Sequence, residues 1–105
     1  MLSGAVPEPW LLDALRGHAG EGAPYWRRVW AMRGLLWAYE PSASAAVIAG
    51  LSDEAWRVRE MAAKVVARHL VGEAFEEVVR RQGDEVPRVR AAASRAVMRL
   101  TDVGA

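Results

Sequence analysis

Lysine and arginine are the residues whose type and spacing most directly suggest chemistry in this sequence, and that chemistry is the binding of anions. Three of them recur with the same mutual spacing further along the chain. The six positions are Arg57, Lys64 and Arg68, followed by Arg88, Arg95 and Arg99. Two such lines of cations could meet successive phosphates of a nucleic-acid backbone. Against this, the net charge is only +1 and Glu54, Glu60 and Glu85 belong to the same segments, which favours a solvated helix flank that repeats with its unit.

Tryptophan is the second residue type with a suggestive arrangement, since the chain has five tryptophans in 105 residues. Trp26, Trp30 and Trp37 follow a helical spacing with Arg33 among them, and exposed tryptophan beside arginine is typical of protein-binding sites. The alternative is that Trp26 and Trp37 pack as a hydrophobic cap, although Arg33 in the same stripe argues against complete burial. Trp56 is expected on an open surface, opposite the core side of its own segment. Its neighbours there are Glu60, Ala63 and Ala67.

No residues are arranged in this sequence for catalysis, metal binding or cofactor binding. The chain has no cysteine, which excludes disulfides, thiolate zinc sites and cysteine nucleophiles. The two histidines, His18 and His69, lie far apart, and no carboxylate spacing completes a metal site with them. His69 falls on the core-facing side of its segment, so we expect it to have a structural role. The protein is therefore expected not to be an enzyme and to use no cofactor.

The lines of cations lie on two segments that repeat. Residues Asp53 to His69 read DEAWRVREMAAKVVARH, and residues Asp84 to Leu100 read DEVPRVRAAASRAVMRL. The interval from Asp53 to Asp84, which we call the repeat interval, also separates the two lines of cations. In each segment, apolar residues recur at the three- and four-residue spacing of one helix face. In each, an aspartate opens the segment, where its side chain can accept from free amides of the first helical turn. The recurrence predicts helix pairs stacked side by side.

The repeated pattern resembles the second helix of a HEAT repeat. The resemblance rests on an aspartate followed by Val-Arg five and six residues on, then small residues and a closing aliphatic residue. It implies that Asp53 with Arg59, and Asp84 with Arg90, belong to a hydrogen-bonded ladder that joins adjacent repeats. It also implies a scaffold that grips another macromolecule, although related folds bind DNA and some repair alkylated bases. No aspartate here matches a catalytic position of those glycosylases.

The resulting fold prediction is an all-α protein, a short right-handed α-solenoid of three HEAT-like helix pairs. Residues 1–105 form a single domain with approximate repeats 9–39, 41–70 and 73–100. The six expected helices are Pro9 to Arg16, Pro24 to Tyr39, Ser42 to Gly50, Glu54 to Leu70, Glu73 to Gln82 and Glu85 to Leu100. The first pair does not align cleanly with the other two. In the fifth helix, Phe75, Val78 and Val79 are expected to face inward.

The function expected from these features is that of a non-enzymatic protein-binding scaffold or adaptor. The partner would dock on the surface of the second helices, mainly on Trp30, Arg33 and Trp56, with Trp26 and Trp37 as weaker contacts. The alternative is a nucleic-acid-binding module that uses the lines of cations on the same helices. Self-association through the uncovered face of the last pair is a further expectation. No segment could span a membrane and no export signal opens the chain, so we expect a cytoplasmic protein without a membrane partner.

Overall fold

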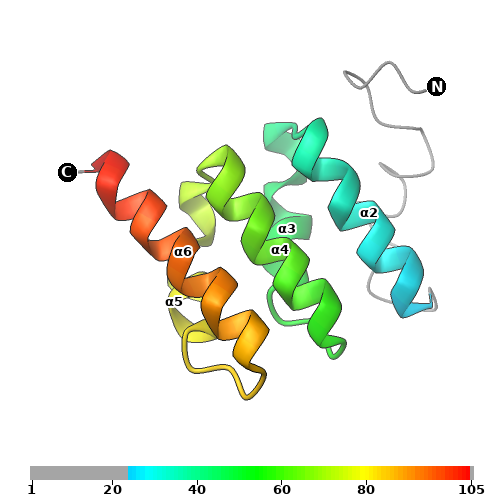
Figure 1. The fold of residues 1–105 in the computed structure, drawn as a ribbon. Coiled ribbons are helices and arrows are strands. Elements are labelled where there is room, and N and C mark those ends of the chain that lie inside the picture. Colours follow the sequence, from blue (N-terminus) through cyan, green and yellow to red (C-terminus); the bar gives the residue numbers. More distant parts are fainter. Residues whose placement is uncertain (1–23, 105) are drawn as a thin grey trace.

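The computed structural model describes residues 24–104, which form α-helices and short 3₁₀ turns with no β-strand in that range (Figure 1). The α-helices are α2 (Tyr25–Trp37), α3 (Ser44–Gly50), α4 (Trp56–His69), α5 (Phe75–Arg81) and α6 (Pro87–Gly104). The 3₁₀ turns are Pro41–Ala43, before α3, and Gly72–Ala74, before α5. The all-α prediction is confirmed for these residues. The predicted helix Pro9 to Arg16, and with it the count of six, lies outside the described residues.

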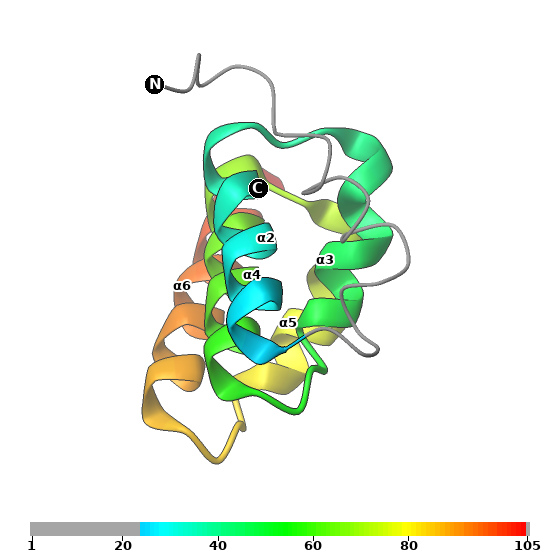
Figure 2. The same cartoon turned by 90° about the vertical axis from the view of Figure 1, so that its right-hand side faces the viewer.

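The helices form two layers. Helices α2, α4 and α6 lie side by side in one layer, which we call the front layer, and α3 and α5 lie behind them (Figures 1 and 2). Helix α4 is central, because it packs against α2, α6 and α3. Side chains on the open side of the front layer are therefore presented by three neighbouring helices at once.

Aspartates set where α4 and α6 begin. Asp53 Oδ1 accepts a hydrogen bond at 2.8 Å from the amide two residues on, and Asp84 Oδ1 accepts one at 2.9 Å from the equivalent amide. Amides at a helix start have no partner inside the helix, so each carboxylate satisfies a donor that would otherwise be lost. These bonds form in the turn before each helix. The helices consequently begin two residues later than predicted, at Trp56 and Pro87.

The core lies between the two layers and is aliphatic. Its largest fully buried side chains are Leu35, Val47, Leu51, Val58, Val65, Val66, Val78 and Val89. Gly50, at the end of α3, allows the layers to approach closely. A Cβ at this position would lie 2.5 Å from Met32 Cε and 3.2 Å from Ala62 Cβ. A side chain there would therefore displace Met32 of α2 and press on α4.

Two predictions about buried and open faces are wrong. Phe75 and Val79 do not face inward, since each is 39 % exposed, because they lie one turn apart on a side of α5 that no described helix covers. Glu60, Ala63 and Ala67 do not lie on an open surface, since none is more than 8 % exposed, because α6 packs against α4 there. Helical periodicity identifies the faces of one helix, but it does not identify the neighbour that covers a second face.

Arginine–aspartate pairs join each of α2 and α4 to the turn before the next helix of the front layer. Arg59 Nε and Nη2 donate to the two carboxylate oxygens of Asp84 at 2.8 and 3.1 Å, and Arg28 Nε and Nη2 donate to Asp53 at 2.8 and 3.0 Å. Arg59 Nη1 also donates to the Asp53 carbonyl at 2.8 Å. Arg28, Arg59 and Arg90 follow one another at the repeat interval. Helix α2 therefore follows the same repeat as α4 and α6. The expectation that the first pair does not align is wrong for this helix, and the other predicted member of the pair lies outside the described residues.

The pKa of Asp84 determines how this arrangement responds to acid. Burial raises the pKa of the Asp84 carboxyl, but hydrogen bonds from Arg59 and the Val86 amide, with the charges of Arg59 and Arg81, lower it below its ordinary value. Such a carboxyl stabilises the fold above its unfolded pKa of about 3.9, and the stabilisation is lost as the pH falls through the folded pKa. We therefore expect the free energy of unfolding, measured by urea titration, to decrease below about pH 4. Asp84→Asn should show a smaller acid decrease, and equal decreases would contradict this assignment.

Candidate functional site

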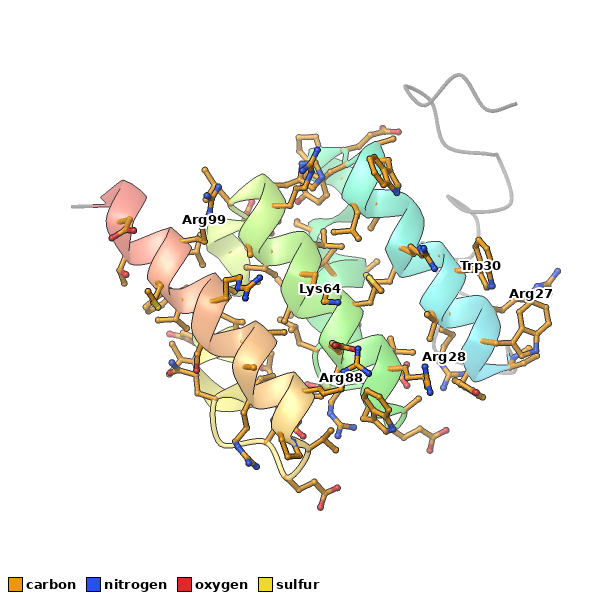
Figure 3. The ribbon with its side chains drawn as sticks, in the orientation of Figure 1. Arg27, Arg28, Trp30, Lys64, Arg88 and Arg99 are labelled. Carbon is orange, nitrogen blue, oxygen red and sulfur yellow. The ribbon has the colours of Figure 1, made fainter. Side chains whose placement is uncertain are left out.

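The open side of the front layer presents three rows of side chains, with one residue from each helix in every row. Residues separated by the repeat interval occupy equivalent places on α2, α4 and α6, as the arginine–aspartate pairs indicate. The rows are Trp26, Arg57 and Arg88, then Arg33, Lys64 and Arg95, then Trp37, Arg68 and Arg99. All nine side chains are exposed and seven are cations. We call these nine residues the basic face, three of which are labelled in Figure 3, namely Lys64, Arg88 and Arg99.

Charge is divided unevenly along the chain. The front-layer helices carry eleven of the fourteen Lys and Arg residues but only two of the thirteen Asp and Glu residues, Glu60 and Asp102. Two of these cations, Arg28 and Arg59, are buried, which leaves nine on the surface. A net charge of +1 for the whole chain therefore conceals a strongly positive side of the molecule.

A groove of about 580 Å³ crosses the basic face between α4 and α6. The cations that line it are Lys64, Arg68, Arg88, Arg95 and Arg99, and its apolar residues are Leu36, Ala67, Ala91 and Ala92. One lining residue is acidic, Glu60, which is 8 % exposed. Its carboxylate accepts from Arg88 Nε at 3.1 Å and lies 3.6 Å from Lys64 Nζ. Arg95 and Arg99 have no acidic partner among residues 24–104, so their charges remain available to a ligand.

Arginine side chains also lie over tryptophan rings on this face. Arg68 Cζ is 5.8 Å from the centre of the Trp37 ring, a contact that links α4 to α2. Arg57 and Arg88 flank the Trp56 ring at 4.9 and 5.6 Å. The attraction between a guanidinium and a π-system holds the arginine in place while its N–H donors can still bind an anion. Trp37 is itself 69 % exposed, so part of its ring surface is accessible to a ligand.

Trp30 and Trp56 are the predicted contacts that lie outside the basic face, and Trp56 is half-buried between Arg57 and Arg88. Figure 3 shows Trp30 and Arg27 on the side of α2 that faces away from α4. The Trp30 ring is 55 % exposed, and the Arg33 guanidinium lies 5.7 Å from its centre. Of the residues predicted to bind a protein partner, Trp26, Trp37 and Arg33 therefore share a surface with the lines of cations. Trp30 belongs to the outer edge of the front layer.

Two residues have roles that reasoning from the sequence missed. Arg28 pairs with Asp53, and its separation from Arg59 by the repeat interval was a signal that could have identified it. Glu60 holds Arg88 across the boundary between α4 and α6, whereas the local spacing of the sequence reveals only its pair with Lys64. No sequence signal predicts a contact between side chains 28 residues apart on different helices.

His69 takes part in packing. Its Nε2 atom lies 3.0 Å from the Leu36 carbonyl oxygen, and its ring stacks on Tyr39 with a centroid distance of 5.2 Å. Within the described range, 24–104, no group of three or more histidine and carboxylate side chains is placed to hold a metal ion. In the same part of the chain, no helix has the length and hydropathy needed to cross a membrane.

No protein-family model matches the chain, and no match is found among curated proteins or solved structures. The candidate sites are those that the structure itself presents, namely the basic face with its groove and the exposed side of α2 that carries Trp30.

Proposed function

We propose that this protein is a non-enzymatic module that binds the phosphate backbone of a nucleic acid on its basic face. The observation that carries the proposal is the set of nine exposed side chains, seven of them cations, on three adjacent helices. Cations on neighbouring helices can neutralise successive phosphates, and the release of counterions from the backbone then drives binding. The like charges of the basic face repel one another, so they do not stabilise the packing of the three helices. A polyanionic ligand would supply the negative charge that balances them.

A single strand is the form of nucleic acid that suits this surface best. Proteins that bind single strands combine a positive groove with aromatic rings on which bases stack. Trp26 and Trp37 stand in the same rows as the cations and are 54 % and 69 % exposed. We therefore place the phosphates along Arg68 and Arg99, with a base stacked on Trp37.

The proposed architecture is a short right-handed α-solenoid of HEAT-like helix pairs, within which 41–70 and 73–100 are two repeats. Its support is the two-layer arrangement and the repeat interval that relates the arginines of the pairs Arg28–Asp53 and Arg59–Asp84 (Figures 1 and 2). In a solenoid, equivalent faces of successive repeats form one continuous surface. Such a geometry explains how short rows from separate helices become one binding face.

The dependence of binding on salt tests the proposed function. The affinity for a short, labelled single strand of mixed sequence would be measured by fluorescence anisotropy. If the five groove cations each neutralise one phosphate, log K should fall with log salt concentration with a slope of about −3.5. Affinity should then decrease about 100-fold between about 50 and 200 mM salt. A duplex of the same sequence should bind more weakly, because its paired bases cannot stack on Trp37. Binding that does not respond to salt, or no binding at low salt, would contradict the proposal.

A scaffold or adaptor that binds another protein is the second candidate, and the exposed aromatic edge of α2 favours it. Trp26 and Trp30 are each more than half exposed, and tryptophan is enriched among the residues that dominate binding energy at protein interfaces. Affinity capture from native cell extract would compare the wild type with Trp30→Ala, with and without nuclease. A protein retained only by the wild type, irrespective of nuclease, would support this candidate. Capture that disappears with nuclease would support the nucleic-acid function.

A further inference from the structure

Helices α4 and α6 carry an equivalent stripe of residues, which is covered in α4 and open in α6. The stripe consists of Trp56, Glu60, Ala63 and Ala67 in α4, and of Pro87, Ala91, Ser94 and Met98 in α6. Helix α6 lies against the stripe of α4, and Ala67 is only 8 % exposed there. The equivalent residue of α6, Met98, is 65 % exposed. The stripe of α6 contains no charged residue, which suits it to packing against another helix.

Arg59 and Arg90 differ in the same way, because Arg59 of α4 has a carboxylate partner and the equivalent Arg90 of α6 has none among residues 24–104. Arg59 Nη1 donates to the Asp53 carbonyl at 2.8 Å, and Arg90 Nη1 donates to the Asp84 carbonyl at the same distance. The remaining donors of Arg59, Nε and Nη2, bind the two oxygens of the Asp84 carboxylate, and Arg59 is 8 % exposed. Arg90 is exposed, and no carboxylate among residues 24–104 pairs with it. Its guanidinium is therefore anchored through Nη1 as that of Arg59 is, while its Nε and Nη2 atoms have no carboxylate partner among residues 24–104.

We propose that this open side of α6 is a docking surface for a partner protein that presents a helix preceded by an aspartate. The aspartate would accept from Arg90 Nε and Nη2, as Asp84 accepts from Arg59, and the helix would pack its small residues against Ala91 and Met98. Bidentate pairing fixes the orientation of a carboxylate as well as its distance, so Arg90 selects where the partner helix begins. This surface adjoins the basic face without using its nine residues, so the inference goes beyond the proposed function.

A second copy of the chain is a poor occupant of this surface. The two aspartates that precede helices in the described part of the chain are Asp53 and Asp84, and both already bind the guanidinium groups of Arg28 and Arg59. A second copy therefore has no free aspartate of this kind to offer within residues 24–104. Two adjacent copies would also bring their positively charged front layers together, and such like-charge contacts oppose association.

A pair of stapled helical peptides tests the proposal on the intact protein. The first carries the sequence Asp84–Leu100, the segment that covers α4, with Arg88→Gln, Arg95→Gln and Arg99→Gln to remove its repulsion from the basic face. The second also carries Asp84→Asn, which keeps the ability to cap a helix but loses the charge. NMR titration of the protein would follow the Arg90 Nε–H resonance and the Met98 methyl resonance.

We expect the aspartate peptide to shift both resonances and to bind at least about 10-fold more tightly than the asparagine peptide. Arg90→Gln in the protein should make the two affinities equal, because the interaction that distinguishes them is then absent. Equal affinities for wild-type protein, or resonances that do not move, would overturn the proposal. Concentration-dependent shifts at Met98 in the protein alone would overturn it in favour of a second copy as the occupant.

Discussion

Asp84→Ala is expected to lower the free energy of unfolding by roughly 3–5 kcal/mol, because it leaves a buried arginine charge without its partner. The side chains of Asp84 and Arg59 are 2 % and 10 % exposed, so water cannot replace the two lost hydrogen bonds. The substitution also removes the acceptor of the Val86 amide before α6. Domains of this size have a total stability of about 5–15 kcal/mol, so a large part of it would disappear. Urea unfolding followed by circular dichroism measures the change.

Asp102→Ala is the matched control for this prediction. Asp102 lies on α6 and is exposed, so the same substitution should change stability by less than about 0.5 kcal/mol. Adding Arg59→Met to Asp84→Ala should recover part of the loss, because a buried charge without a partner is then no longer present. Similar effects of Asp84→Ala and Asp102→Ala would show that the bidentate pair does not join the helix pairs energetically.

Reversal of two groove charges, Arg95→Glu with Arg99→Glu, is expected to weaken nucleic-acid binding by at least roughly 50-fold near 100 mM salt. Each arginine lost removes one phosphate contact, and each glutamate introduced repels the backbone. Neither arginine has an acidic partner among the described residues, so the fold should be preserved. Anisotropy titrations measure the affinity, and circular dichroism verifies the helix content.

The control for this reversal is Arg27→Glu with Arg80→Glu, which changes the net charge by the same amount. Arg27 lies on the side of α2 away from α4 (Figure 3). Arg80 belongs to α5, which lies behind the front layer (Figures 1 and 2). If binding depends on the basic face, this variant should lose only a few-fold in affinity, through the weaker long-range field. Equal losses in the two variants would mean that net charge alone, and not the groove, determines binding.

The helices of residues 24–104 and their repeat could be predicted from local signals. Periodic apolar positions located α4 and α6, and Asp53 and Asp84 marked their starts to within two residues. The resemblance implied that Asp53, Arg59, Asp84 and Arg90 belong to a ladder between repeats, but it did not state that the carboxylate bound by Arg59 is that of Asp84. The helices, their starts and their repeat could be predicted because each depends either on residues that are close in sequence or on the recurrence of the same residue types at the repeat interval.

The composition of the candidate site could not be predicted, because it depends on which helices become neighbours. Trp37 meets Arg68 only when α2 lies beside α4, and Arg88 meets Glu60 only when α6 covers α4. The prediction for Ala63 failed for the same reason, since a second helix covers what a single helical wheel shows as open. One signal in the sequence was missed. Trp26, Arg33 and Trp37 stand at the repeat interval from Arg57, Lys64 and Arg68, and this alignment would have placed the predicted protein contacts beside the lines of cations.

The most direct test of the central claim is to map the bound strand on the protein by NMR. The signals to follow are the arginine Nε–H groups and the tryptophan indole N–H groups during titration with a short single-stranded oligonucleotide. Binding on the basic face should shift the signals of Arg95, Arg99 and Trp37 more than that of Trp30, which only Arg33 of the basic face contacts. Shifts centred on Trp30 and Arg27, or no saturable shift at low salt, would contradict a nucleic-acid site in the groove between α4 and α6.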